Sequence, residues 1–544
     1  MIRRSIAGAA LTALLAIAAP AYAQRGPIVE APAGAAEGQA QGDILVFKGL
    51  PYAQPPVGAG RWAPPRPLPK WSGVRPATAF GAACIQPPAG GGLYADPPPR
   101  TSEDCLSLNI WTPRAAHRAP VIVWIHGGAF VGGFGSEGIY DGTKFAQRGV
   151  ILVSINYRLG ILGFLAHPGL SAESPHGVSG NYGLMDQIEA LRWVQRNIAA
   201  FGGDPANVTV AGESAGGLSV LYLLAAPPAR GLFAKAIAES AYAVSMPELK
   251  HAKFGEPAAE TTGEAVAAKL GLRTVSDLRG EDAQTLTNAA GMAGFGPLGT
   301  VDGKLLPHQL VETFDLGEQA HVPLLVGFNS GEIRSLRVLA SKPPATAAAY
   351  EASIHDRYRD LADDFLKLYP SSDMGESVLA TTRDGLYGWT AERAAIKQTA
   401  AGQPAYLYRF DHGYPAADSA GLHGFHASEL PFVFGTIDRL PANWPKPPAT
   451  AAEARMSDAM VGYWTSFART GKPEAAGEAT WRPYGSDQAY MAFEDVPRAA
   501  DHLEPGMYPL HEAVVCRRRA KGGLPWTWNV GLAAPPLPPP APGC

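Results

Sequence analysis

The chain has 544 residues, a formal net charge of −4 at neutral pH and four cysteines. Charges of both signs are mixed along the chain and form no basic stripe, which argues against nucleic acid as a partner. The even number of cysteines is compatible with disulfide bonds in an oxidising compartment. The composition says nothing about the oligomeric state.

The first 23 residues have the pattern of a secretory signal peptide. Two arginines precede the apolar run 6–19, which is followed by Ala21-Tyr22-Ala23. This run is too short to span a bilayer, and no later apolar stretch approaches membrane-spanning length. We therefore expect cleavage after Ala23 and a secreted or periplasmic protein with no membrane span.

The rest of the chain is expected to have three parts. Residues 24–41 are expected to form a flexible N-terminal arm, because residues 31–41 are small and polar. Residues 42–520 are long for one compact unit, and we expect a single catalytic domain with insertions. Residues 521–544 are expected to form an extended, proline-rich tail.

The middle of the chain alternates short β-rich apolar runs with longer helical patterns, which predicts a mostly parallel sheet covered by helices. The expected strands, in chain order, are residues 121–125, 150–157, 207–210, 234–238, 323–329 and 405–410. The expected helices are residues 184–198, which Gly202 and Gly203 end, 215–226, and 450–470, with Gly471 at its end.

Ser214 is the centre of the pentapeptide Gly212-Glu213-Ser214-Ala215-Gly216, between an expected strand and an expected alanine-rich helix. This context is typical of a nucleophile elbow, in which flanking glycines allow a tight turn and the hydroxyl points outward over the sheet edge. Glycine and serine are common, so the pentapeptide alone is weak evidence. Its context predicts that Ser214 is a nucleophile.

A second loop, His126-Gly127-Gly128-Ala129-Phe130, follows the expected strand at 121–125. Small residues allow backbone N–H groups to point into a cavity, where each can stabilise an oxyanion by about 3 kcal/mol. Alone, this run is better interpreted as an ordinary glycine turn. Its pairing with a downstream elbow is what an acyl-transfer site needs.

These motifs resemble the type-B carboxylesterase family, which includes cholinesterases, bacterial para-nitrobenzyl esterases and some fungal lipases. The resemblance covers roughly residues 40–490. Other matching segments are Phe47-Lys48-Gly49-Leu50-Pro51-Tyr52-Ala53, Glu103-Asp104-Cys105-Leu106-Ser107-Leu108-Asn109, Phe201-Gly202-Gly203-Asp204-Pro205 and Tyr463-Trp464-Thr465-Ser466-Phe467-Ala468. The resemblance implies an α/β-hydrolase fold, with a mostly parallel central sheet flanked by helices and large insertions forming the substrate pocket.

The resemblance also implies a catalytic triad of Ser214, Glu332 and His426, in the chain order of α/β hydrolases. Glu332 ends the segment 326–332, and His426 begins the segment 426–434. Ile333 stands where the family usually has glycine after the glutamate.

The family pattern places the oxyanion donors on the backbone N–H groups of Gly128, Ala129 and Ala215. It also contains a disulfide that matches Cys84 with Cys105. The remaining cysteines, Cys516 and Cys544, are expected to pair only because they are left over from an even count in an oxidising compartment.

The residues alone leave alternatives for the acid and the base. Without the resemblance, Glu332 would be interpreted as a surface carboxylate. Asp302 and Asp411 also follow or end expected strands, and His423 lies three residues before His426.

Other residues near the motifs are interpreted as supporting the structure. Arg61 with Glu103, and Arg158 with Asp186, resemble family ion pairs that hold loops to the core. Ser240 resembles a family serine that lies behind the site. Glu213 could tune the electrostatics of the site or hydrogen-bond in a buried network, and both interpretations stay open.

The predicted chemistry is two-step acyl transfer on a small-molecule ester, with no metal or organic cofactor. The site residues include no cluster with zinc-ligand spacing. Two alternatives remain: a catalytically silent adhesion or binding protein on the same fold, and a peptidase on the same scaffold. Silent relatives typically lose a triad member, whereas this chain has all three candidates.

The identity of the ester cannot be read from the sequence, because pocket walls come from loops, here roughly residues 86–100 and 246–299. The first loop contains Tyr94 and no tryptophan. Cholinesterases carry a tryptophan there to hold the choline cation. A choline-ester specialist is therefore not expected.

Overall fold

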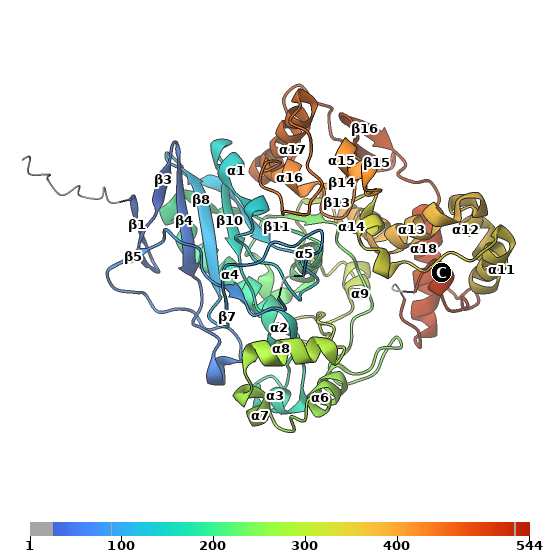
Figure 1. The fold of residues 1–544 in the computed structure, drawn as a ribbon, viewed down its shortest axis with the longest axis horizontal. Helices are drawn as coiled ribbons and strands as arrows, with labels where there is room; N and C mark the ends of the chain where they lie inside the picture. The colour runs from blue at the N-terminus through green and yellow to red at the C-terminus, as the bar shows by residue number, and fades with distance from the viewer. Residues whose placement is uncertain (1–25, 89, 527–528) are drawn as a thin grey trace, which may run out of the picture.

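A computed structural model describes residues 26–88, 90–526 and 529–544. The predicted signal peptide and its cleavage site lie outside these residues. A twisted central sheet runs through the molecule, with helices on both faces and further helical groups at its periphery (Figure 1). None of the helices in the described ranges is long and apolar enough to cross a bilayer.

The central sheet has eleven strands in the order β16-β15-β14-β13-β12-β11-β9-β10-β8-β4-β3. The strands from β10 to β15 in this order are parallel, and those beyond them pair antiparallel. Their bounds are β3 Gln39–Gln41, β4 Ile44–Pro51, β8 Ser107–Pro113, β9 Ala119–Ile125, β10 Ile151–Ile155, β11 Gly203–Glu213, β12 Lys235–Glu239, β13 Leu324–Asn329, β14 Ala405–Phe410, β15 Ala489–Phe493 and β16 Pro497–Asp501. The predicted mostly parallel sheet is confirmed.

Both faces of the sheet are apolar. Successive side chains of a strand point to opposite faces, and the central strands bury apolar side chains on both, so each strand contributes to a core on either side. In β9, Val121 and Val123 lie in the core on one face, and Ile122 and Trp124 lie in the core on the other. The first face packs against α4 Tyr182–Asn197, α5 Ala215–Ala225, α9 Leu310–Asp315 and α14 Trp389–Ala400. The second packs against α1 Thr143–Gln147, α16 Leu430–Phe434 and α17 Ala451–Thr470.

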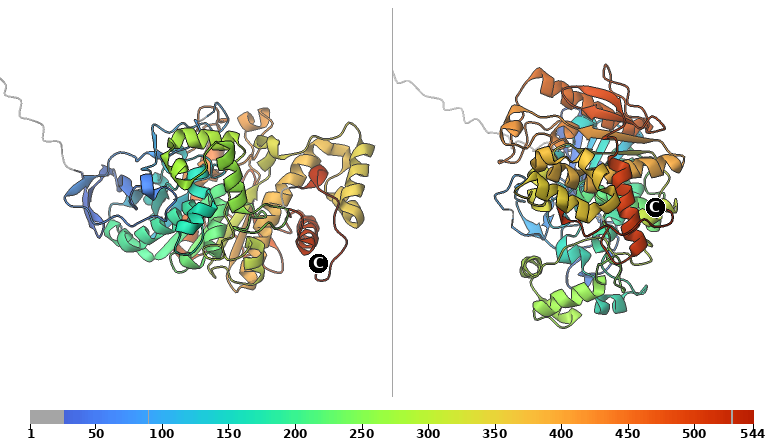
Figure 2. Two further views of the ribbon diagram at one scale, coloured as in Figure 1. Left: turned by 90° about the horizontal axis from the view of Figure 1, so that it is seen from below. Right: turned by 90° about the vertical axis from the view of Figure 1, so that its right-hand side faces the viewer.

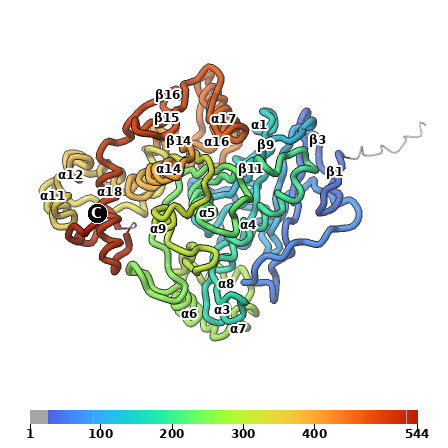
Figure 3. Tube along the Cα trace, turned by 180° about the vertical axis from the view of Figure 1, so that it is seen from behind, coloured from blue at the N-terminus to red at the C-terminus, as the bar shows by residue number. Residues whose placement is uncertain are grey.

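The remaining helices form peripheral groups. One group contains α2 Gly160–Phe164, α3 Pro168–Glu173, α6 Ala259–Lys269, α7 Val275–Gly280 and α8 Ala283–Met292. The other contains α11 Ala347–Tyr358, α12 Ala362–Leu368, α13 Met374–Arg383 and α18 Met507–Lys521, and it lies at the opposite end of the molecule from β1 and β3 (Figures 2 and 3). Two short helices, α10 Glu332–Ser335 and α15 Pro415–Ser419, follow β13 and β14.

Of the segment 24–41, expected to be a flexible arm, the structure describes residues 26–41, and this part contains strands. It forms β1 Ile28–Ala31 and β2 Gly34–Glu37, which pair with each other and with β5 Val74–Pro76, and it supplies the edge strand β3. Its small residues allow close packing against neighbouring side chains and do not make the segment flexible. At Gly34 (φ +136°), a Cβ would lie 2.4 Å from Trp71 Nε1.

In the residues that the structure describes after α18, the proline-rich tail has one short helical turn, Gly531–Ala533, and otherwise little regular structure. It nevertheless packs against the protein, because Val530, Ala534 and Leu537 are buried. The backbone N–H of Gly531 donates to Tyr358 Oη at 2.7 Å. A disulfide joins Cys516 in α18 to Cys544.

Candidate active site

Ser214 lies in the turn between β11 and α5. Its φ of +56° is unusual for a residue with a side chain. The turn is held by backbone hydrogen bonds, in which Ser214 N–H donates to Glu239 O at 2.9 Å and Leu218 N–H donates to Ser214 O at 2.8 Å. This conformation is that of a nucleophile elbow.

The glycines around the elbow are required by close approach to β9. A Cβ on Gly216 would lie 2.0 Å from Ile125 O, and a Cβ on Gly212 would lie 2.6 Å from the backbone of Gly216. Both distances are far below contact distance. The turn and the end of β9 can therefore approach each other only with glycine at these positions.

The structure brings Ser214, His426 and Glu332 together, although they are far apart in the sequence. His426 Nε2 is 2.9 Å from Ser214 Oγ. On the other side of the ring, His426 Nδ1 hydrogen-bonds to Glu332 Oε2. Glu332 lies just after β13, at the start of α10, and is fully buried.

Glu332 is held in place by two donors from neighbouring strands. Ser240 Oγ, after β12, donates to Glu332 Oε1 at 2.6 Å, and the backbone N–H of Asn329 donates to the same oxygen at 2.9 Å. These bonds leave Oε2 for His426. The imidazole is thereby fixed in orientation, with its Nε2 toward the serine.

The base faces a second carboxylate, because Glu213 Oε1 is 3.1 Å from His426 Nε2. Burial alone lowers the pKa of His426, but the negative charges of Glu213 and Glu332 outweigh burial and raise it to about 9. Burial raises the pKa of Glu213 to about 7, against the opposing effect of His426. The charges of these groups are therefore strongly interdependent.

Two further buried carboxyls lie behind the site. Burial raises the pKa of Glu239 to about 8, although its oxygen accepts a 2.8 Å hydrogen bond from Trp464 Nε1. Burial, with the charges of Glu213 and Glu239, also raises the pKa of Glu429 well above its usual range. Asn329 Nδ2 donates to Glu429.

The loop after β9 turns sharply beside Ser214. Gly128, Ala129 and Phe130 all have positive φ, at +102°, +54° and +59°. Among the residues that the structure describes, the N–H groups of Gly128, Ala129 and Ala215 donate no hydrogen bond. Gly128 and Ala129 line the same cavity as Ser214. These three donors are free to bind an anionic oxygen.

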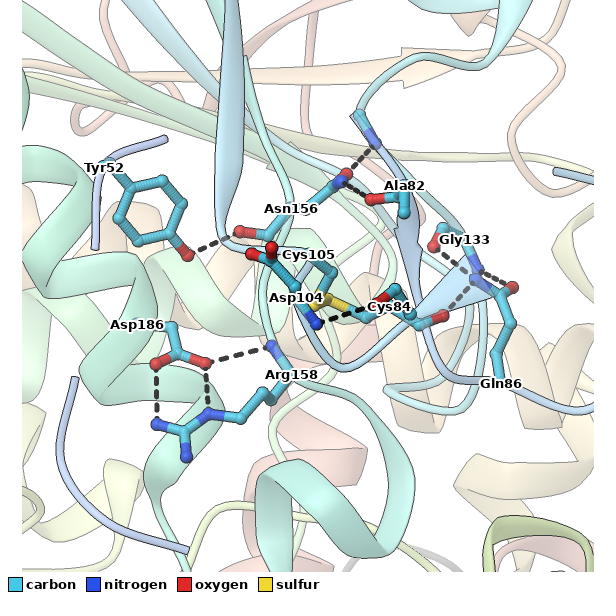
Figure 4. The surroundings of a disulfide bond; sticks show 12 residues. Tyr52, Ala82, Cys84, Gln86, Asp104, Cys105, Gly133, Asn156, Arg158 and Asp186 are labelled. Atoms are coloured by element: carbon cyan, nitrogen blue, oxygen red, sulfur yellow. Dashed lines mark hydrogen bonds and ion pairs between the residues drawn. A yellow bond between two sulfur atoms is a disulfide. The ribbon is translucent and has the colours of Figure 1, made fainter. Parts of the chain in front are cut away.

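The disulfide between Cys84 and Cys105 supports this loop (Figure 4). Two residues after Cys84, the side chain of Gln86 forms two bonds with Gly133: Oε1 accepts the Gly133 N–H at 3.0 Å, and Nε2 donates to Gly133 O at 3.1 Å. Gln86 Nε2 also donates to Cys84 O at 3.1 Å. The disulfide loop and the loop after β9 are therefore tied together.

The two predicted ion pairs are present, and none of their four residues lines the cavity that contains Ser214. Arg61 binds Glu103 with two bonds of 2.7 Å. The buried pair of Arg158 and Asp186 is also bidentate, with bonds of 2.8 and 2.7 Å (Figure 4). The first pair joins two loops and the second joins a loop to α4, which is a structural role.

Ser214 opens into a cavity of about 500 Å³, a size typical of small-molecule sites. Its walls are mostly apolar and aromatic. The lining residues are Tyr94, Gly127, Gly128, Ala129, Gly132, Gly133, Glu137, Ile139, Tyr140, Glu213, Ser214, Tyr242, Leu336, Val338, Leu339, Leu386, Tyr387, His426, Ala427, Leu430, Pro441 and Trp444.

The alternative acids and base are occupied elsewhere. His423 lies between Asp418 and Asp411, at 2.7 and 3.2 Å. Asp302 accepts backbone N–H groups of its own turn, including that of Leu305 at 2.8 Å. Neither His423, Asp411 nor Asp302 lines the cavity.

Several cavity residues escaped the sequence analysis. Glu137 follows the glycine loop but belongs to no motif that we used. Leu386 and Tyr387 lie in a π-helical turn, Asp384–Gly388, that joins α13 to α14. Such turns are frequent at functional sites, but the sequence pattern does not distinguish them from an ordinary helix. Tyr94 is a further lining residue for which the sequence indicates no role. Its hydroxyl donates to His426 O at 2.8 Å.

Comparison with known proteins decides the family. Residues 25–508 match the carboxylesterase family. This chain belongs to the carboxylesterase family. The resemblance to carboxylesterases that the sequence motifs indicated is thereby confirmed. The protein is a carboxylic ester hydrolase with the α/β-hydrolase fold.

Related proteins cover most of this carboxylesterase. It is 36% identical over 479 residues to a fumonisin B1 esterase of Sphingopyxis macrogoltabida, which covers 85% of each chain. It is 37% identical over 462 residues to a para-nitrobenzyl esterase of Bacillus subtilis, covering 84% of this chain and 92% of the relative.

Solved structures give the same assignment. A para-nitrobenzyl esterase structure aligns with a TM-score of 0.76 at 34% identity, covering 89% of this chain and 99% of the other. A carboxylesterase of Geobacillus stearothermophilus aligns with a TM-score of 0.71 at 33% identity and the same coverage.

Proposed function

We propose that this carboxylesterase hydrolyses small-molecule esters through a covalent acyl-enzyme on Ser214, with His426 as the base and Glu332 as the acid. The observation that carries the proposal is the chain of hydrogen bonds from Ser214 Oγ through His426 to Glu332 at the wall of the cavity. A serine hydroxyl needs such a base to become an effective nucleophile.

In the first step, Ser214 Oγ attacks the ester carbonyl carbon as its proton passes to His426 Nε2. The carbonyl oxygen becomes negatively charged, and the N–H groups of Gly128, Ala129 and Ala215 stabilise it. The bond to the alcohol oxygen then breaks, and His426 donates its proton to the leaving alcohol. The product is an ester of Ser214 with the acyl group.

In the second step, a water molecule attacks the acyl carbon as His426 removes its proton. The same N–H groups stabilise the second oxyanion. The bond to Ser214 Oγ breaks, the oxygen recovers the proton from His426, and the carboxylic acid leaves. Glu332 and Glu213 both face the imidazole, and their negative charges stabilise the imidazolium in each step.

We also propose that the protein acts outside the cytoplasm. The N-terminal sequence pattern supports export, and the Cys84–Cys105 and Cys516–Cys544 disulfides are compatible with an oxidising compartment. The chemistry requires no metal or organic cofactor.

The proposal is tested by assaying an aryl ester and a peptide amide in parallel, with the wild-type protein and with Ser214→Ala. We expect hydrolysis of the ester by the wild type, none by the variant, and an unchanged circular dichroism spectrum. Faster hydrolysis of the amide would indicate a peptidase. Failure of the wild type on a panel of esters varied in acyl length and alcohol size would indicate a silent binding protein.

A further inference from the structure

The cavity wall near Ser214 is acidic as well as apolar. Glu137 and Glu213 are its carboxylates, and the described residues that line it include no lysine or arginine. His426 is the nearest group that can carry a positive charge, and Glu213 and Glu332 already face it. A negatively charged group on a bound ester would therefore have no lysine or arginine among these lining residues to pair with.

Glu137 is held in a fixed position in the loop between β9 and the turn Gly138–Tyr140. Its Oε1 accepts the backbone N–H of Phe134 at 3.1 Å, and its own backbone N–H donates to Phe134 O at 3.4 Å. These contacts keep the side chain in the wall of the cavity.

The arginines closest in sequence to lining residues do not offset these carboxylates. Arg334 binds Glu376 at 2.7 Å, and Arg439 binds Asp141 at 2.7 Å. Arg337 lies between Leu336 and Val338 in the sequence but does not line the cavity.

We propose that Glu137, together with Glu213, is a specificity-determining residue that excludes esters carrying a carboxylate near the scissile bond and favours uncharged esters. This inference rests on the proposed function of the same site. Apolar groups of an uncharged ester would lie against Leu336, Val338 and Tyr387, which line the cavity.

Two costs act against an anionic ester. Its carboxylate loses hydration on entering an apolar cavity, which any apolar pocket would impose. It then lies near the carboxyl groups of Glu137 and Glu213, which repel it when they are ionised, and this is the contribution specific to this protein. Only the second cost depends on Glu137, so a variant at this position separates the two.

The discrimination should increase with pH. Burial raises the pKa of Glu137 to about 8, with further contributions from Asp96 and Glu213 and an opposing one from the Phe134 N–H. Glu137 is therefore mostly uncharged below this pH and charged above it. The other titratable groups around it are Tyr140, Tyr157 and His426. The titration of His426 affects both esters alike and cancels in a ratio of their rates.

The test compares kcat/KM for 4-acetoxybenzamide and 4-acetoxybenzoate, which share an acetyl group and differ in one charge. We expect the wild type to prefer the amide-bearing ester at least about tenfold at about pH 9, and less at about pH 6.5. In Glu137→Gln, which keeps an oxygen for the Phe134 N–H, the preference at the higher pH should decrease at least about threefold. The matched control Glu264→Gln changes an exposed carboxylate of α6 and should leave the ratio as in the wild type.

A ratio that Glu137→Gln leaves unchanged would overturn the inference, because the preference would then come from dehydration alone. If the variant does not fold, a wild-type ratio that stays constant between the two pH values overturns it equally. In both cases hydrolysis of 4-acetoxybenzamide would still support the proposed function. Absence of hydrolysis of both esters would overturn the proposed function and this inference together.

Discussion

At the scale of single residues, the proposed mechanism implies that the two carboxylates facing His426 determine the pH dependence of the reaction. Only the neutral imidazole accepts the serine proton, so kcat/KM should rise as pH increases through the raised pKa of His426, about 9. Glu213→Gln removes one of the charges that raise this pKa. We expect the inflection of the rate profile to move to lower pH.

Steady-state rates on an uncharged aryl ester across the pH range check this prediction. Glu248→Gln, a matched change at a carboxylate that binds Lys253 outside the cavity, should leave the inflection in place. An inflection that does not move in Glu213→Gln would mean that Glu213 is uncharged when the base titrates, and that it contributes only hydrogen bonding.

The site residues differ in how far the sequence predicts them. Ser214 is recognisable from its own neighbourhood, because the elbow needs glycines at fixed positions. His426 lies 94 residues from Glu332 and 212 residues from Ser214 in the sequence, so only the family resemblance indicates the acid and the base.

Glu137 could not be predicted in this way. It lies in a loop whose backbone path after Phe130 depends on contacts with distant residues such as Gln86. Which loop residues face a cavity is decided by such tertiary contacts and not by a local pattern.

At the scale of structural elements, Gln86 joins the disulfide loop to the loop that carries Gly128 and Ala129. Gln86→Ala removes both bonds to Gly133. Because the proposed oxyanion donors would then be less well positioned, we expect kcat to fall about tenfold with a smaller change in KM.

Steady-state kinetics with an aryl ester measures this effect. Gln54→Ala is the control, since the side chain of Gln54 donates to Pro67 O at an exposed site outside the cavity. Equal kinetics for Gln86→Ala and the wild type would show that the loop keeps its geometry without Gln86.

The π-helical turn Asp384–Gly388 is a second element whose position affects the pocket. Two of its residues, Leu386 and Tyr387, line the cavity. Its Gly385 packs closely against the tail, where a Cβ would lie 2.7 Å from Val530 Cγ1. Val530→Ala should loosen this wall. We expect a higher KM for bulky esters and nearly unchanged kinetics for an acetyl ester.

Leu537→Ala provides the matched control, because Leu537 is buried in the same tail but packs in the cluster with α11 and α12. A change in KM that is equal in both variants would contradict the account and indicate general loosening of the tail.

At the scale of the whole molecule, the Cys516–Cys544 disulfide closes the C-terminal tail onto α18. For a loop of this size, the bond can stabilise the fold by about 3–4 kcal/mol at most. The tail is packed rather than solvated, because Val530, Ala534 and Leu537 are buried. The disulfide therefore restricts mainly the unfolded chain, and Cys544→Ser should lower the unfolding free energy by about 2–3 kcal/mol.

Urea unfolding of the wild type and of Cys544→Ser, with non-reducing peptide mapping of the wild type, checks this prediction. Cys544 that is alkylated without reductant would contradict the pairing, and equal unfolding free energies would contradict the stabilisation.

The central sheet and the helices packed on it are easier to predict from the sequence than the N-terminal edge of the fold. The central strands and α4, α5 and α17 follow clear apolar patterns, since each is buried on the sheet or against it. Residues 24–41 were expected to be flexible because residues 31–41 are small and polar. The described part, residues 26–41, instead contains three strands, because Gly34 allows the chain to pass close to Trp71 and because β4 provides an edge for β3. Such pairing depends on partners that a local pattern does not contain.

The central claim is that Ser214 becomes acylated during ester hydrolysis. Its most direct test is labelling of the folded protein with a fluorophosphonate, followed by mass spectrometry of the peptide that contains Gly212 to Gly216. The account predicts one adduct per chain, on Ser214, with parallel loss of esterase activity. An adduct on another serine, or full activity after complete labelling of Ser214, would contradict it.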